Sequence, residues 1–258
     1  MSRKAAWHPP RKVCIFGDGR TATKEEVLGL WTAKYLPKNG TYVLRSSDDP
    51  SMKVRPRTAG SAAVIYRPRI VCAECNNTWM GQIEQRAETA GLGVMIRPHK
   101  EDEVKLSLDV EQQTALATWA SKVALFTPYL YHRPEAVWPQ HLTAFHGATR
   151  PPDDFAVWLG TYAGQGPYFS IHPGRVRNVP FPGNFTTFHL GHVVFQVFQG
   201  EGGTPYTADS PDVFIRGGPP LFFRIWPPRR EAVPWPTGAM DFDALERLAG
   251  LAPAAVRG

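Results

Sequence analysis

Two cysteines three positions apart constrain this chain more than any other feature of its sequence. Cys72 and Cys75 are followed at once by Asn76 and then by a stretch of helical character. This spacing lets two thiolates reach one zinc ion from a single tight turn. A tetrahedral site needs two further ligands, and Cys14 is the only other cysteine in the chain. Zinc bound by Cys14, Cys72 and Cys75 is therefore one prediction from the sequence.

The odd number of cysteines also bears on the cellular compartment. Three cysteines cannot all pair within the chain, so a disulfide framework is not expected and the reducing cytoplasm is the expected location. Zinc binding and metal-free burial are two open interpretations of these cysteines, and redox or nucleophilic chemistry is a third. His8 and Asp18 lie near Cys14 in the sequence and are the candidates for a fourth metal ligand.

The composition is that of a globular protein with an excess of positive charge. Of the 258 residues, 43% are hydrophobic and 20% are charged, which excludes a disordered or fibrous chain. The net charge of +6 permits an anionic partner such as nucleic acid without requiring one. The basic N-terminus is not followed by the apolar segment of a signal peptide, and no segment approaches the roughly 20 apolar residues that span a membrane.

Local patterns predict helices and strands in the first half of the chain. Thr23 and Glu26 have the spacing of a capping box, which predicts that a helix begins at Thr23. Pro128 is expected to end the longest helix. The expected helices are residues 23–37, 76–91 and 109–128, and the expected strands are residues 13–16, 41–44 and 62–66.

The second half is rich in aromatic and β-branched residues, which favour strands. The expected strands are residues 157–160, 168–171, 186–198, 213–215 and 221–226. Residues 188–195 carry apolar side chains at both alternations, which predicts a central strand buried on both faces. His189 and His192 are an odd number of positions apart and cannot share one strand face, so a two-histidine metal site is not expected there. A short helix capped by Asp241 closes the pattern.

These elements predict an α+β fold in two parts. Residues 1–100 would form a small cysteine-bearing ββα unit with a basic arm and a hairpin. Residues 101–258 would form a helix followed by an antiparallel sheet. The basic residues of the hairpin are the candidates for nucleic-acid binding, although a solvated surface explains them equally well. They are Lys53, Arg55, Arg57, Arg67 and Arg69.

The order of these motifs resembles the HNH endonuclease family, whose fold is the His-Me finger or ββα-metal fold. The resemblance covers about residues 13 to 125 and ends with a helix at residues 116–124. The segments that carry it are Cys14-Ile15-Phe16, Thr23-Lys24-Glu25, Trp31, Cys72-Ala73-Glu74-Cys75-Asn76 and Trp79.

The resemblance implies a chemistry and assigns roles to residues of this chain. In this family a histidine takes a proton from water, and a divalent cation such as Mg²⁺ or Mn²⁺ is held against the scissile phosphate. A separate zinc ion bound by two cysteine pairs has a structural role. Glu25 matches the acidic residue that precedes the histidine, and Asn76 matches the metal-binding residue of the helix. Cys14, Cys72 and Cys75 match three of the four zinc ligands.

The chain departs from the family pattern at three positions. Glu26 stands in place of the base histidine, Gly17 in place of the second cysteine of the first pair, and Gly29 in place of a proline before Trp31. A glutamate has an unperturbed pKa of about 4.3 and is a weaker proton acceptor than imidazole at neutral pH.

Three functional hypotheses follow from these matches and departures. The first is an HNH-type nuclease, or a catalytically impaired descendant, with Glu25, Glu26 and Asn76 around a divalent cation. The second is a non-catalytic nucleic-acid-binding protein of the same fold. The third is an enzyme redeployed to a small anionic substrate. Glu26 and Asn76 have an alternative interpretation as helix-capping residues without a catalytic role. Glu84 is expected to be a solvated or salt-bridged helix position.

Overall fold

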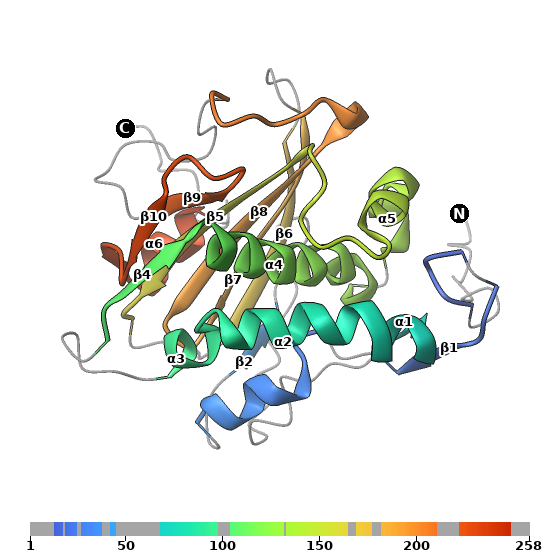
Figure 1. Ribbon diagram of the computed structural model, residues 1–258, viewed down its shortest axis with the longest axis horizontal. Coiled ribbons are helices and arrows are strands. Elements are labelled where there is room, and N and C mark those ends of the chain that lie inside the picture. The colour runs from blue at the N-terminus through green and yellow to red at the C-terminus, as the bar shows by residue number, and fades with distance from the viewer. Residues whose placement is uncertain are drawn as a thin grey trace, which may run out of the picture.

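A large mixed sheet and the long helix that lies across it dominate the computed structural model (Figure 1). The structure describes residues 13–17, 19–24, 27–37, 42–44, 68–97, 104–131, 133–164, 169–176, 182–210 and 222–248. The fold combines helices and sheets in the manner of the α+β class, as the sequence predicts. In the part of the chain that the structure describes, no helix is both long enough and apolar enough to cross a membrane.

The large sheet has seven strands in the order β11-β5-β8-β7-β6-β2, and β9 also pairs with β5. Its four central strands form antiparallel pairs, whereas β2 runs parallel to β6 and β11 runs parallel to β5. The strands are β2 (Tyr42–Leu44), β5 (Phe155–Tyr162), β6 (Phe169–Val176), β7 (Gly183–Leu190), β8 (Val193–Gly200), β9 (Phe222–Trp226) and β11 (Ala239–Met240).

Two small sheets flank the large one. The strand β1 (Ala22–Lys24) is antiparallel to β3 (Arg69–Cys72), and β4 (Leu106–Asp109) is antiparallel to β10 (Ala232–Trp235). The first of these pairs leads directly into helix. The chain continues from β3 through α1 (Ala73–Cys75), a π-helical turn η3 (Asn76–Met80) and α2 (Gly81–Thr89) without a break.

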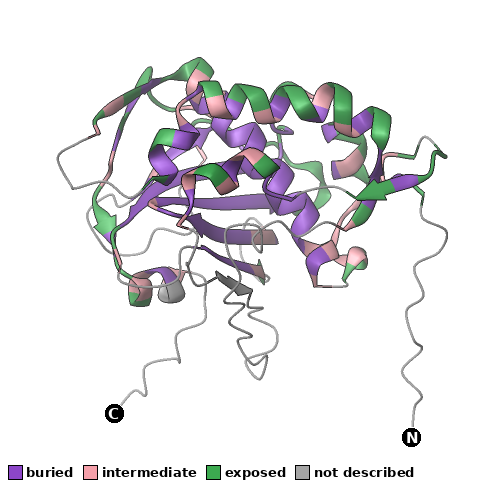
Figure 2. Ribbon diagram, turned by 90° about the horizontal axis from the view of Figure 1, so that it is seen from below, coloured by how far each residue is buried: buried purple, intermediate pink, exposed green. Residues whose placement is uncertain are grey.

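The helix α4 (Val110–Leu130) connects the layers of the fold. It contacts five strands of the large sheet on one side and packs against α2 on the other (Figure 1). Its start is fixed by a capping box, in which Asp109 Oδ1 accepts from the Gln112 amide at 2.8 Å and Gln112 Oε1 accepts from the Asp109 amide at 3.0 Å. Buried positions surround α4 and the central strands, and exposed residues lie on the outward sides of the helices (Figure 2).

Shorter helices complete the described structure. They are the 3₁₀ turns η1 (Leu30–Tyr35), η4 (Pro134–Ala136) and η5 (Glu201–Gly203), and the helices α3 (Leu92–Ile96), α5 (Pro139–Phe145) and α6 (Phe242–Leu248). The final helix begins as predicted, because Asp241 Oδ1 accepts from the Ala244 amide at 2.7 Å. Gly91, at φ 99°, lies between α2 and α3, where the sequence places the end of a helix.

Both faces of the large sheet are buried where α4 crosses it. Along β8, Phe195 and Val197 belong to the core under α4, whereas Val194 and Phe198 belong to a second core together with Leu245 of α6. Apolar side chains at both alternations therefore do indicate burial on both faces, as expected for residues 188–195.

Residues 186–198 are nevertheless not one strand, and this prediction was wrong. They form β7, β8 and the tight turn between them at Gly191 and His192. Gly191 has φ 58°, and a Cβ atom there would lie 1.9 Å from the carbonyl oxygen of Ile96. Glycine is needed at this position, and it lets two buried strands follow each other with almost no polar interruption in the sequence.

Three helix boundaries also differ from the predictions. Thr23 lies within β1, and its hydroxyl donates to the carbonyl of Val71 at 3.0 Å instead of capping a helix. The first helical turn that the structure describes starts at Leu30. The second helix starts at Ala73, before the predicted Asn76. The helix α4 continues two residues past Pro128, a position so near its end that proline disrupts little of the remaining hydrogen bonding. The predicted strands 62–66 and 213–215 lie outside the described residues.

Candidate metal site

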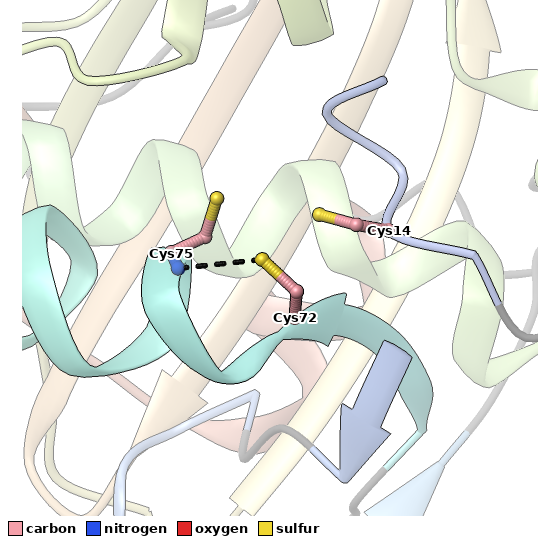
Figure 3. Close-up of side chains that lie close together, drawn as sticks. All are labelled: Cys14, Cys72 and Cys75. Atoms are coloured by element: carbon pink, nitrogen blue, oxygen red, sulfur yellow. Dashed lines mark hydrogen bonds between the residues drawn. The ribbon is translucent and has the colours of Figure 1, made fainter. Parts of the chain in front are cut away.

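Three buried cysteine side chains meet beside the N-terminus of α1 (Figure 3). Cys14, Cys72 and Cys75 are 3%, 2% and 4% exposed, and their sulfur atoms all lie within 4.8 Å of one another. Two sulfur ligands of one tetrahedral zinc ion, each about 2.3 Å from the metal, are roughly 3.8 Å apart. The three cysteines therefore lie close enough to hold a metal ion.

Two of the cysteines are positioned by the junction between a strand and a helix. Cys72 is the last residue of β3 and caps α1, so its sulfur accepts the backbone amide of Cys75 at 3.5 Å (Figure 3). The two-residue spacer of the motif forms the first turn of helix between them. An amide that donates to sulfur stabilises the thiolate form that a metal ion requires. The local fold thus explains why cysteines at this spacing converge.

The third cysteine lies on a separate turn that packs against β3. The Cys14 amide donates to the carbonyl of Arg20 at 2.9 Å, and the Gly17 amide donates back to the Cys14 carbonyl at 3.2 Å. Gly17 has φ 81°, which favours glycine in this tight turn. The Ile15 amide donates to the carbonyl of Ile70 at 2.8 Å and joins the turn to β3. Backbone hydrogen bonds therefore hold Cys14 next to the Cys72 and Cys75 pair.

Burial controls the charge of these thiols. Burial away from water raises the pKa of Cys14, and it raises the pKa of Cys75 to about 12, with the neighbouring thiols adding to the effect. Without a metal ion both groups are neutral thiols at physiological pH. Reactive cysteines are thiolates, so this environment does not favour redox or nucleophilic chemistry. Metal binding would have to displace the thiol protons.

One histidine from a distant part of the chain touches the cluster. His146 follows α5, and its Nε2 atom lies 3.7 Å from Cys75 Sγ. Its ring stacks on Phe16 at a centroid distance of 5.3 Å and an interplanar angle of 14°. Trp79 meets the same ring at 5.7 Å and 67°. No spacing rule connects residue 146 to the cysteine motif, so this contact could not be predicted from the sequence.

The structure describes part of the predicted catalytic set. Asn76 is half-buried, follows Cys75 directly and opens the π-helical turn, where its carbonyl accepts the Gly81 amide. Such turns are rare and occur often at functional sites. Glu25 and Glu26 lie outside the described residues, and so do the suggested fourth ligands His8 and Asp18.

Of the predicted nucleic-acid-binding residues, Lys53, Arg55, Arg57 and Arg67 lie outside the described residues. Arg69 is exposed at the start of β3. It stands directly opposite Lys24 of β1, which is also exposed. Like charges in directly opposed positions of a sheet destabilise the pair, and an anion bound between them would relieve the repulsion.

Glu84 has a more specific environment than the sequence indicated. Its carboxylate accepts from the indole of Trp31 at 2.5 Å and from the indole of Trp119 at 2.9 Å, and it pairs with the ammonium group of Lys122. Lys122 is fully buried, and the Glu84 side chain is 15% exposed. The expected salt-bridged helix position is thus a largely buried ion pair that joins η1, α2 and α4.

Comparison with protein-family models, with curated proteins and with solved structures gives no match to this chain.

Proposed function

We propose that the protein is of the HNH type and acts on nucleic acid through a ββα unit stabilised by structural zinc. The observation that carries the proposal is the meeting of Cys14 with Cys72 and Cys75 at the start of the helix that bears Asn76. The family resemblance assigns these residues to one zinc site and one catalytic helix. The antiparallel pair β1 and β3, followed by α1 and α2, supports the ββα order.

The donor set fits zinc in this role. Three cysteine sulfurs are soft ligands that suit zinc, and the cluster is buried among aromatic and aliphatic side chains. A structural zinc ion contributes to folding by joining segments distant in sequence, here the turn at Cys14 and the helix that starts after Cys72. The three cysteines are free thiols, which supports location in the reducing cytoplasm.

Catalysis would depend on Asn76 together with Glu25 and Glu26. Asn76 would help to hold Mg²⁺ or Mn²⁺ against a phosphate, and Glu26 would accept the proton from water in place of histidine. The π-helical turn at Asn76 supports its assignment, because it sets this residue apart from a regular helix.

Nicking of supercoiled plasmid in the presence of Mg²⁺ or Mn²⁺ tests the nuclease proposal. We expect slow nicking that Asn76→Ala abolishes and that Asn77→Ala, on the exposed neighbouring position, leaves unchanged. Glu26→His restores the family base and should raise the rate by roughly 10²–10⁴-fold, the usual contribution of general acid–base catalysis. Absence of nicking in both the natural chain and Glu26→His would contradict hydrolysis.

Binding without hydrolysis is the second candidate, and the opposed cations Lys24 and Arg69 favour it. Lys24 is exposed on β1, and Arg69 is exposed at the start of β3, the strand that leads to the cysteine cluster. Gel-shift titration should show affinity for DNA or RNA that falls steeply with salt, because phosphate binding releases counterions. Lys24→Gln with Arg69→Gln should reduce the slope of log affinity against log salt by about 2. An unchanged slope in this double variant would rule out the surface as a phosphate-binding site.

A further inference from the structure

We propose that His146 is the fourth ligand of the metal site, which would then consist of three cysteines and one histidine. This inference rests on the proposed zinc and adds a residue that the family resemblance does not supply. The separation of 3.7 Å between Cys75 Sγ and His146 Nε2 is the observation that carries it. Sulfur at about 2.3 Å and nitrogen at about 2.0–2.1 Å from one tetrahedral zinc ion lie roughly 3.6 Å apart.

The position of the imidazole ring is fixed by both cysteine segments. Phe16, two residues after Cys14, stacks on the ring, and Trp79, four residues after Cys75, packs against it edge to face. The backbone of His146 is held as well, since its amide donates to the carbonyl of Leu142 at 3.0 Å at the end of α5. The ring therefore presents Nε2 to Cys75 Sγ at 3.7 Å. Of the described metal-ligating atoms in this cluster, only the three cysteine sulfurs all lie within 4.8 Å of one another, so metal binding would draw Nε2 closer to the rest of the cluster.

The inference explains how a site with a missing cysteine can still be closed. Gly17 stands where the first cysteine pair of the family would have its second member, and it offers no side chain. Three thiolates and one neutral imidazole form a donor set that is well known for structural zinc. With His146 bound, no position of a tetrahedral ion remains open for water, so the site would be structural rather than catalytic.

Coordination by His146 would also link distant parts of the chain. The cysteines lie on the turn at residue 14 and at the start of α1, whereas His146 belongs to the segment that follows α5. A single ion would therefore fasten α5 to the β1–β3 pair. Loss of the metal should loosen both regions together, which a purely cysteine-based site would not require.

Two substitutions separate metal binding by His146 from its aromatic packing. His146→Phe keeps a ring that can stack on Phe16 but removes the nitrogen ligand. His146→Cys removes the ring but supplies a sulfur ligand. Gln140→Ala, at an exposed position of α5, is the control. For each full-length protein we would measure zinc content by mass spectrometry, zinc affinity by competition with a chromophoric chelator, and the visible spectrum after replacement of zinc by Co²⁺.

We expect His146→Phe to lower zinc affinity by more than roughly 100-fold, the upper end of the effect of losing an outer-shell partner. Its Co²⁺ spectrum should change with the loss of the nitrogen ligand, whereas His146→Cys should keep high affinity and show a stronger sulfur-to-metal absorption. If His146→Phe has the zinc affinity and the Co²⁺ spectrum of the natural chain, His146 is not a ligand, whereas the zinc proposal itself would stand. Weaker zinc binding in His146→Cys with natural zinc binding in His146→Phe would also overturn the role of His146, because aromatic packing would then explain the effect. A natural chain that binds no metal would refute the zinc proposal itself.

Discussion

The buried pair of Glu84 and Lys122 leads to a prediction about stability. Glu84 accepts three hydrogen bonds, from Lys122, Trp31 and Trp119, and Lys122 is fully buried. Removing one member of a buried ion pair typically destabilises a protein by about 3–5 kcal/mol, because the remaining charge loses its partner. The two single substitutions should not cost the same, since they leave different groups behind.

Lys122→Met should lower the free energy of unfolding by about 3 kcal/mol, the lower end of this range. The Glu84 carboxylate keeps both indole donors in this variant, and the Glu84 side chain is 15% exposed. Glu84→Met should cost about 5 kcal/mol, the upper end of this range, because it removes the carboxylate that pairs with a fully buried ammonium group and accepts from two indole N–H groups. The double substitution should be less destabilised than Glu84→Met alone, since no buried charge remains.

Urea denaturation followed by circular dichroism measures these differences, and thermal melting checks them. A loss of about 3 kcal/mol should lower the melting temperature of a chain of this size by roughly 6–12 °C. Lys34→Met is the matched control, because Lys34 pairs with Glu88 one helical turn along α2 from Glu84, but at the surface. Exposed ion pairs contribute little to stability. A Lys122→Met variant no less stable than Lys34→Met, or single effects that simply add in the double variant, would refute the reasoning.

Three further substitutions test the fold. Gly191→Ala should destabilise strongly by urea denaturation, because its Cβ would lie 1.9 Å from the carbonyl oxygen of Ile96 at a φ of 58°. Asp109→Ala should cost about 1 kcal/mol in the same assay through loss of the α4 cap. Hydrogen bonding to Lys34 lowers the pKa of Glu88, so the pair stabilises the fold above the unfolded pKa of glutamate and loses that effect as pH falls. The small stability difference between the natural chain and Glu88→Gln should therefore shrink in acid.

The features that were predictable from the sequence are those with a local cause. The capping residues Asp109 and Asp241 start helices as expected, because an N-cap depends on three or four adjacent residues. Burial on both faces of the central strands could also be predicted, because it follows from the alternation of side chains along the strand. The convergence of Cys72 and Cys75 belongs to the same class, since their spacing and the first turn of a helix determine it.

The features that were missed depend on tertiary contacts. Thr23 has the spacing of a helix cap, but its hydroxyl donates to a carbonyl of β3, a strand almost fifty residues away in the sequence. The turn at Gly191 was missed because a single glycine within a stretch of strand-forming residues looks like part of a strand. Only the close approach of Ile96 explains why glycine is there. The contact of His146 with Cys75 has no sequence signal, because α5 brings the histidine in from outside the motif.

The helix α2 depends on α4 as well as on the cysteine motif at which its segment begins. Its residues Ile83 and Ala87 are buried, α2 packs against α4, and Glu84 on the same helix accepts hydrogen bonds from Lys122 and Trp119 of α4. A unit that ended before α4 would expose this apolar surface to water and remove the α4 donors to the Glu84 carboxylate. Both changes would lower the free energy of unfolding. The cysteine cluster belongs to the same continuous core as α4 and the sheet. A metal ion at the cysteines would therefore stabilise the start of α2, while the Glu84 pair fixes its middle, and the two together hold the segment that carries Asn76.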